Sequence, residues 1–113
     1  MEIFEQYEAC EERIKFLDKT LKQCTDETYL VLTEAYEKEK EVLKVVLSLI
    51  VETIEDVKDP YIRTILHLKY IGEDRAGKKH RLMNWEIANR MNYSEEWVKQ
   101  KLKKFRKQFK EEV

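Results

Sequence analysis

Positively charged side chains crowd one stretch near the C-terminus, between Lys99 and Lys110. No acidic residue interrupts this stretch, and its basic residues are Lys99, Lys101, Lys103, Lys104, Arg106, Lys107 and Lys110. Lysine and arginine bind phosphate groups, and a polyanion that they neutralise releases its condensed counterions, which favours binding. The stretch therefore predicts contact with phosphates. The alternative is a solvated surface that keeps the protein soluble, although acids usually alternate with bases on such a surface.

The spacing of apolar residues predicts that this stretch is a helix with one buried side. At 100° per residue, a group of four apolar residues lies within roughly 60° of arc. They are Val98, Leu102, Phe105 and Phe109. The opposite side must face solvent, and it carries Glu96, Gln100, Lys103 and Lys107, with Trp97 and Lys104 on one flank and Lys99 on the other. For Trp97, packing at the edge of the core is the alternative to contact with a ligand.

A shorter helix and a tight turn precede this one. Trp85, Ile87, Ala88 and Met91 recur at the spacing of one helical face, and Asn92 suits the left-handed conformation that ends a helix. Ser94 then has the type of an N-cap and is followed by an acidic first turn. The pattern predicts a helix-turn-helix whose second helix, from Ser94 to Lys110, enters the major groove of DNA.

Charge is divided unevenly along the chain. Residues 59–113 hold 14 Lys and Arg against 8 Asp and Glu, a net charge of +6, whereas residues 1–58 hold 8 against 15, a net charge of −7. This division makes the C-terminal half the candidate for binding DNA. Between Glu73 and Arg81 we expect an exposed basic loop, in which Lys78, Lys79 and Arg81 add phosphate contacts or are simply solvated.

The N-terminal half predicts a long antiparallel helical hairpin over residues 1–58. Its first helix, about Glu2 to Cys24, has an apolar seam at alternating steps of four and three, and its second runs from about Glu27 to Val57. The seam of the first helix is Ile3, Tyr7, Cys10, Ile14, Leu17, Leu21 and Cys24, and that of the second is Tyr29, Leu32, Tyr36, Glu39, Leu43, Val46, Ile50 and Ile54. Further apolar residues of the second helix need another surface, either the C-terminal half or a second copy of the chain. A homodimer is expected on a separate ground, because an isolated module of this size buries little surface on DNA and two half-sites would supply useful affinity.

Other function classes find little support in the sequence. A chain of 113 residues with two Gly, one Pro and 40% charged residues predicts an all-α fold. Two isolated histidines and two distant cysteines offer no metal-ligand spacing, and no phosphate-cradling glycine loop or nucleophile arrangement occurs. We therefore expect no metal, no cofactor and no enzyme. No apolar run reaches membrane-spanning length, and the unpaired cysteines suit a reducing cytoplasm.

A break at Lys58 separates the hairpin from the domain of residues 59–113, where Asp59 caps a helix and Pro60 takes its first position. The stretch from Asp59 to Gly72, followed by Ile87-Ala88 and by Ser94 with Val98 four residues later, resembles phage and prophage transcriptional regulators of the RinA/ArpU type. The C-terminal halves of these regulators are similar to region 4 of bacterial sigma factors.

This resemblance implies roles for individual residues of the second helix. It implies that Glu96 and Gln100 contact bases and that Ser94 and Lys99 contact phosphates, and it adds RNA polymerase as a partner. A carboxylate can accept from cytosine and a carboxamide can pair with adenine, which agrees with these roles. We expect a sequence-specific DNA-binding transcriptional regulator; the alternative is a helical module that binds RNA polymerase or another phage protein without reading DNA by itself.

Overall fold

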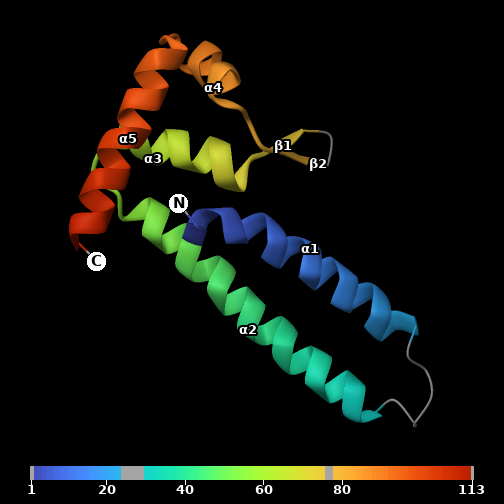
Figure 1. Ribbon diagram of the computed structural model, residues 1–113. Coiled ribbons are helices and arrows are strands. Elements are labelled where there is room, and N and C mark those ends of the chain that lie inside the picture. The colour runs from blue at the N-terminus through green and yellow to red at the C-terminus, as the bar shows by residue number, and fades with distance from the viewer. Residues whose placement is uncertain (1, 24–29, 76–77, 113) are drawn as a thin grey trace. The chain divides into compact units, whose positions relative to one another are not determined.

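The computed structural model describes residues 2–23, 30–75 and 78–112, and it confirms an all-α fold class (Figure 1). The helices are α1 (Glu2–Gln23), α2 (Leu30–Glu55), α3 (Pro60–Leu66), the π-helix η2 (His67–Ile71), α4 (Asn84–Met91) and α5 (Glu95–Glu112), and two short strands are β1 (Glu73–Arg75) and β2 (Lys78–His80). The chain divides into two compact units, one of Glu2–Glu52 and one that begins at Thr53.

The N-terminal unit is the expected antiparallel hairpin of α1 and most of α2 (Figure 1). Tyr7, Leu17 and Ile50 of the predicted seam are buried, and most of its other described members are half-buried. Ile3 and Leu32 are exceptions, because 41% and 45% of their surfaces remain exposed. The seam positions at 24 and 29 lie outside the described residues.

Two ion pairs join α1 to α2. The guanidinium of Arg13 binds Glu39 through both carboxylate oxygens, at 2.7 Å from Nε and 3.2 Å from Nη2, and Lys40 pairs with Asp18. The hydrogen bond from Arg13 lowers the pKa of Glu39, and that from Lys40 lowers the pKa of Asp18. The ion pair with Arg13 across the hairpin explains why a charged residue, Glu39, stands in the apolar seam.

The C-terminal unit begins with the predicted cap. The Asp59 carboxylate accepts from the backbone N–H groups of Tyr61 at 2.9 Å and Ile62 at 3.4 Å, and Pro60 opens α3. Partial burial raises the pKa of Asp59, but these two hydrogen bonds and the charge of Lys101 outweigh it and lower the pKa below its ordinary value. The helix continues through η2 and ends at Gly72, as expected.

The helices α3, η2, α4 and α5 supply the core of this unit. Its buried residues include Ile62, Ile65, Leu66, Leu68, Ile87, Ala88, Val98, Leu102 and Phe105. The predicted buried side of the basic helix is confirmed, since Val98 is 0% exposed and Phe109, at its far end, is half-buried. This packing fixes which side of α5 faces solvent.

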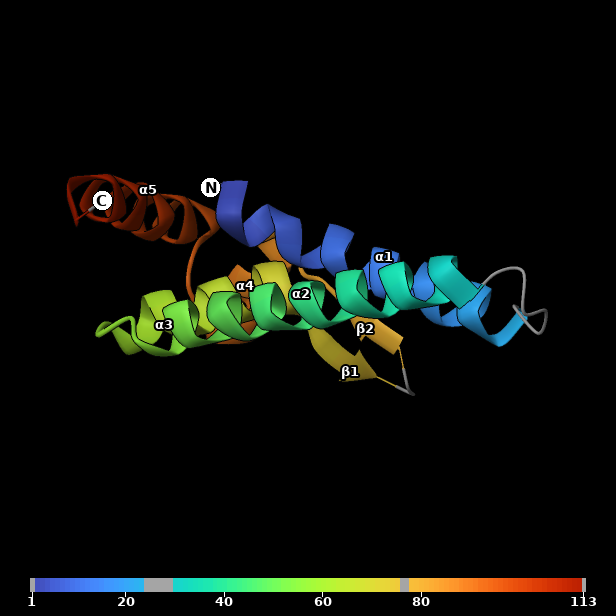
Figure 2. The same ribbon diagram turned by 90° about the horizontal axis from the view of Figure 1, so that it is seen from below.

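The segment from Glu73 to Arg81 is not the irregular loop that we expected. Strands β1 and β2 pair antiparallel, with Glu73 opposite His80 and Arg75 opposite Lys78 (Figure 2). Gly72 enters this ribbon with φ of 93°, and a Cβ there would stand 3.0 Å from the His80 carbonyl oxygen. Such strands cannot be recognised from the sequence, because each has only three residues, all polar, and so lacks the alternation of apolar and polar side chains that indicates a strand.

Candidate nucleic-acid interface

The turn between α4 and α5 has the geometry that its residue types predict. Asn92 adopts the left-handed conformation, φ 61° and ψ 40°, and the next N–H, that of Tyr93, donates to the Ala88 carbonyl at 3.0 Å. The Ser94 hydroxyl oxygen accepts from the Trp97 backbone N–H at 3.1 Å and so caps α5. Ser94 thus has a structural role, and its own hydroxyl proton is still available to a ligand.

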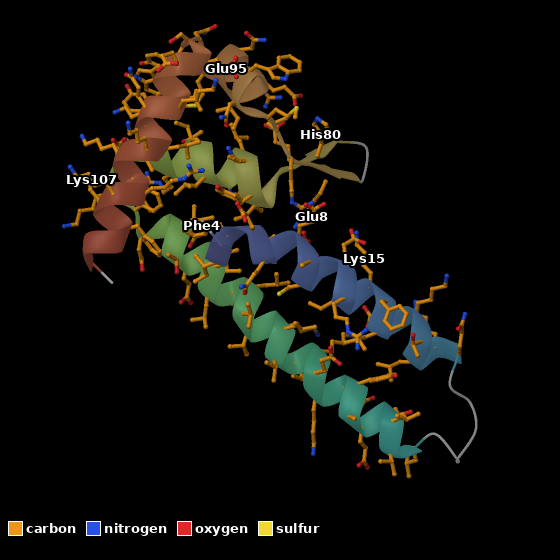
Figure 3. All side chains as sticks on the ribbon, viewed as in Figure 1. Phe4, Glu8, Lys15, His80, Glu95 and Lys107 are labelled. Atoms are coloured by element: carbon orange, nitrogen blue, oxygen red, sulfur yellow. The ribbon has the colours of Figure 1, made fainter. Side chains whose placement is uncertain are left out.

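The solvent side of α5 carries the residues that the sequence placed there. Glu96, Gln100, Lys103 and Lys107 are all exposed. Lys107 projects from the side of α5 that lies away from α3 (Figure 3). No hydrogen bond or ion pair joins these four side chains to another residue that the structure describes. We call this set, Glu96, Gln100, Lys103 and Lys107, the outer face of α5.

The two flanks of the outer face differ. Lys99 lies 3.5 Å from the Glu95 carboxylate one turn earlier, in a solvated pair that contributes little to stability. Lys104 on the other flank is exposed and borders an open cavity. Both ammonium groups can turn toward a phosphate without breaking the core.

The Trp97 ring packs against two tyrosine rings and the ammonium group of a lysine. We call these four residues, Tyr61, Tyr93, Trp97 and Lys101, the aromatic cluster. The Trp97 ring stacks on Tyr93 with centroids 3.8 Å apart and planes 11° apart, and Tyr61 meets both rings edge-on at 5.7 and 5.9 Å. The Lys101 ammonium lies 5.6 Å from the Trp97 ring and 3.5 Å from Asp59. A hydrogen bond with Tyr61 raises the pKa of Tyr93.

The aromatic cluster fastens the start of α5 to the start of α3, which favours packing as the role of Trp97. Sequence reasoning missed Tyr61 and Tyr93. A signal existed for Tyr93, because it directly precedes the N-cap Ser94, and an apolar residue at that position often packs against the first turns of the helix. Tyr61 gave no such signal, since it is 36 positions before Trp97.

The basic residues of the ribbon lie apart from α5. In Figure 1, α3 and its continuation η2 lie between α5 and the β1–β2 ribbon, and Figure 3 places His80 and Lys107 at opposite sides of the unit. Lys79 is exposed, whereas Arg81 is half-buried and donates from Nε to the Tyr70 carbonyl at 2.9 Å. The side chain of Lys78 is outside the described part of the structure. The structure does not bring these three residues together with the outer face of α5.

Further contacts hold the ribbon against the helices. Arg90 of α4 pairs with Glu73 of β1, and the Leu82 N–H donates to the Leu68 carbonyl at 3.0 Å. Arg81 is therefore better explained as part of this attachment than as a phosphate ligand.

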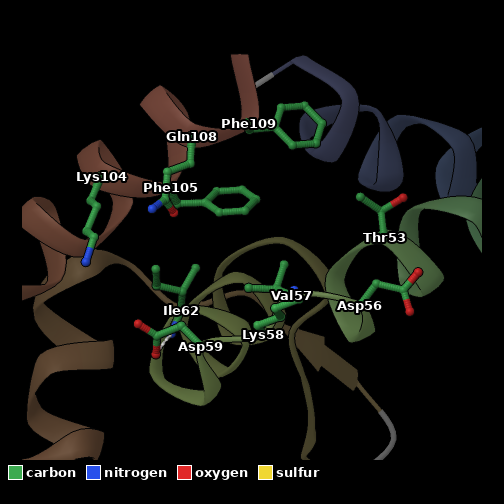
Figure 4. Close-up of a pocket in the computed structure, with 10 residues that line it drawn as sticks. All are labelled: Thr53, Asp56, Val57, Lys58, Asp59, Ile62, Lys104, Phe105, Gln108 and Phe109. Atoms are coloured by element: carbon green, nitrogen blue, oxygen red, sulfur yellow. Dashed lines mark hydrogen bonds between the residues drawn. The ribbon is translucent and has the colours of Figure 1, made fainter. Parts of the chain in front are cut away.

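A cavity of about 650 Å³ opens beside the C-terminal half of α5 (Figure 4). Val57, Ile62 and Phe105 supply apolar walls, while Asp59 and Lys104 bring opposite charges. Asp59 is already used as the α3 cap. The lining thus has no convergent set of groups for one reaction.

Within the described part of the chain, no group of three or more His, Cys, Asp or Glu side chains is placed to hold a metal ion, and no helix is both long and apolar enough to cross a membrane. Comparisons of the chain with protein-family models, curated proteins and solved structures find no match.

Proposed function

We propose that this chain is a sequence-specific DNA-binding transcriptional regulator that inserts α5 into the major groove. The observation that carries the proposal is the outer face of α5, which stands exposed directly after a turn of helix-turn-helix type. The net charge of +6 over residues 59–113 supports it, because phosphates reward local positive charge. The sequence resemblance to sigma region 4 points the same way.

The proposed contacts divide into two kinds. Glu96 and Gln100 read base edges, since their carboxylate and carboxamide match the hydrogen-bonding groups of cytosine and adenine in the major groove. Lys99, Lys103, Lys104 and Lys107 bind phosphates and set the position of the helix. The Ser94 hydroxyl, fixed by the cap, donates to a further phosphate. Trp97 acts through the aromatic cluster and orients α5.

The proposed setting is the cytoplasm of a bacterium that carries a phage or prophage. One helix-turn-helix buries little surface on DNA, so useful affinity calls for a homodimer on two half-sites. RNA polymerase is a further proposed partner, by resemblance to sigma region 4.

A second candidate function is favoured by the apolar residues of α2 that remain exposed, such as Val42 and Val45 at 62% and 57%. Such surface suits a helical module that binds RNA polymerase or another phage protein. This module would not need to read bases by itself.

A paired substitution on the outer face tests the first proposal. Genomic DNA captured by the purified protein supplies a bound fragment, and Gln100→Ala with Lys103→Ala should weaken binding to it about 10- to 100-fold, because a base contact and a phosphate contact are lost. The melting temperature should hardly change, since both side chains are exposed.

Lys19→Ala with Gln23→Ala is the matched control, because it removes the same two residue types from exposed positions of α1. It should leave the affinity unchanged. Equal affinity of the outer-face variant and the wild type would assign DNA reading to another surface, and failure to capture any genomic fragment would favour the interaction module.

A further inference from the structure

One side of α2 is both apolar and exposed. Val31, Val42, Val45 and Leu49 keep 77%, 62%, 57% and 55% of their surfaces exposed. These four residues lie within roughly 60° of arc at 100° per residue, and they are about 100° around the helix from the seam that faces α1. Single exposed aliphatic residues are ordinary on a protein surface, but a continuous stripe marks an interaction site.

The stripe has the period of a coiled coil. Ala35 and Lys38 are also exposed and fill its gaps, so the positions Val31, Ala35, Lys38, Val42, Val45 and Leu49 follow one another at alternating steps of four and three. We call these six residues the α2 stripe. Two helices supercoil when each presents such a seam to the other. α2 thus carries two seams, one that faces α1 and one whose side chains the rest of the N-terminal unit leaves largely exposed.

We propose that the α2 stripe pairs with the α2 stripe of a second copy of this chain, antiparallel, to form a homodimer. Antiparallel pairing centred between Lys38 and Val42 places Val31 against the partner's Leu49. It also places the small Ala35 against the partner's Val45, which is larger. The gap beside each Ala35 is then filled by a larger side chain, as close packing requires.

The charges of the stripe select the antiparallel direction. A parallel pair would set Lys38 against the partner's Lys38 in the core and Ala35 against the partner's Ala35, leaving both a repulsion and a gap. In the antiparallel pair, Lys38 lies along the partner's Val42 with its aliphatic stem. Its ammonium then reaches the partner's Glu41, which offsets the approach of the two Glu41 carboxylates across the axis. This self-complementarity argues for a second copy over an unrelated partner.

Size-exclusion chromatography of the full chain, with light scattering to measure its mass, tests whether it forms a dimer. The wild type should elute with twice the chain mass of 13.8 kDa, and Val42→Glu with Leu49→Glu should elute as the monomer. Because glutamate favours helix more than valine does, circular dichroism should show that the helicity of this variant is unchanged. Phe16→Glu is the matched control, because Phe16 is 52% exposed on α1 and outside the stripe, and it should remain dimeric.

A wild type that stays monomeric up to a concentration of about 1 mM, or a charged stripe variant that still dimerises, would refute the proposal. A monomer that binds another protein through the stripe counts among the refuting outcomes.

Cross-linking tests the direction of pairing. With Cys10 and Cys24 replaced by serine, Glu41→Cys should form a covalent dimer with a short bismaleimide, because Glu41 neighbours its own copy across the antiparallel axis. Ala35→Cys should not, and the reverse result would establish parallel pairing and overturn the direction. The Gln100→Ala and Lys103→Ala variant should still dimerise, so failure of DNA binding and failure of dimerisation are separate outcomes.

Discussion

At the scale of single residues, Asp59 connects the start of α3, Lys101 and the aromatic cluster. Its carboxylate caps α3, lies 3.5 Å from the Lys101 ammonium and, through Lys101, supports the aromatic cluster. Its pKa is raised by partial burial but lowered more strongly by the two backbone hydrogen bonds and Lys101, so the folded value is below the unfolded one. A carboxyl with a depressed folded pKa stabilises the protein above its unfolded pKa, about 3.9, and loses this contribution as pH falls through the folded value.

The variant Asp59→Asn makes that contribution measurable. Asparagine also caps helices, so the variant keeps the cap and loses only the charge. In urea unfolding at pH 7 the wild type should be more stable than Asp59→Asn, and the difference should shrink toward zero as the pH is lowered from about 5 to below 3. A difference that stays constant over this range would show that the charge of Asp59 does not stabilise the fold. Asp59→Ala, which also loses the cap, should cost about 1 kcal/mol at pH 7.

At the scale of elements, the aromatic cluster decides how α5 is held against α3. Trp97 is half-buried, and Tyr93 and Tyr61 cover two sides of its ring. Since the outer face of α5 starts one residue earlier, at Glu96, a change in this attachment would also turn the proposed base-reading residues. Packing in the cluster and DNA binding are therefore expected to be coupled through Trp97.

Truncation of Trp97 tests this coupling. Trp97→Ala should lower the free energy of unfolding by about 2 kcal/mol, below the range for fully buried tryptophans because the ring is only half-buried. Trp97→Phe keeps an aromatic ring and should recover much of both stability and DNA affinity. Trp85→Ala is the control, because Trp85 is 54% exposed on α4, and it should shift stability by less than about 0.5 kcal/mol. Loss of DNA affinity in Trp97→Phe at unchanged stability would instead assign Trp97 a direct contact with DNA.

At the scale of the whole molecule, the uneven division of charge along the chain should determine how binding responds to salt. The net charge of −1 combines +6 over residues 59–113 with −7 over residues 1–58. Binding of the basic half to DNA should weaken as salt rises. Pairing of two acidic hairpins through the α2 stripe should hold or strengthen, because salt screens their mutual repulsion.

Titration with salt separates these two events. If four lysines of each protomer neutralise one phosphate each, the dimer makes about eight phosphate contacts, and its DNA dissociation constant should rise about 10,000-fold between about 50 and 200 mM salt, while the dimer persists. Lys107→Ala removes one contact from each protomer and should reduce the slope of log affinity against log salt by about 2. A DNA affinity that hardly responds to salt would contradict phosphate contacts by α5.

Much of the fold could be predicted from the sequence because its signals are local. The cap at Asp59, the left-handed turn at Asn92 and the buried side of α5 from Val98 to Phe105 all depend on residues within a few positions of one another. The exposure of the outer face of α5 follows from the same helical period.

The sequence by itself thus determined the helices, their ends and their apolar sides, since capping and periodicity act over one or two turns. Only the tertiary structure decided that Glu39 pairs with Arg13, that Tyr61 meets Trp97, and that the basic ribbon lies apart from α5. Such contacts join residues dozens of positions apart, and their formation depends on how whole elements pack, which no local pattern of residue types encodes.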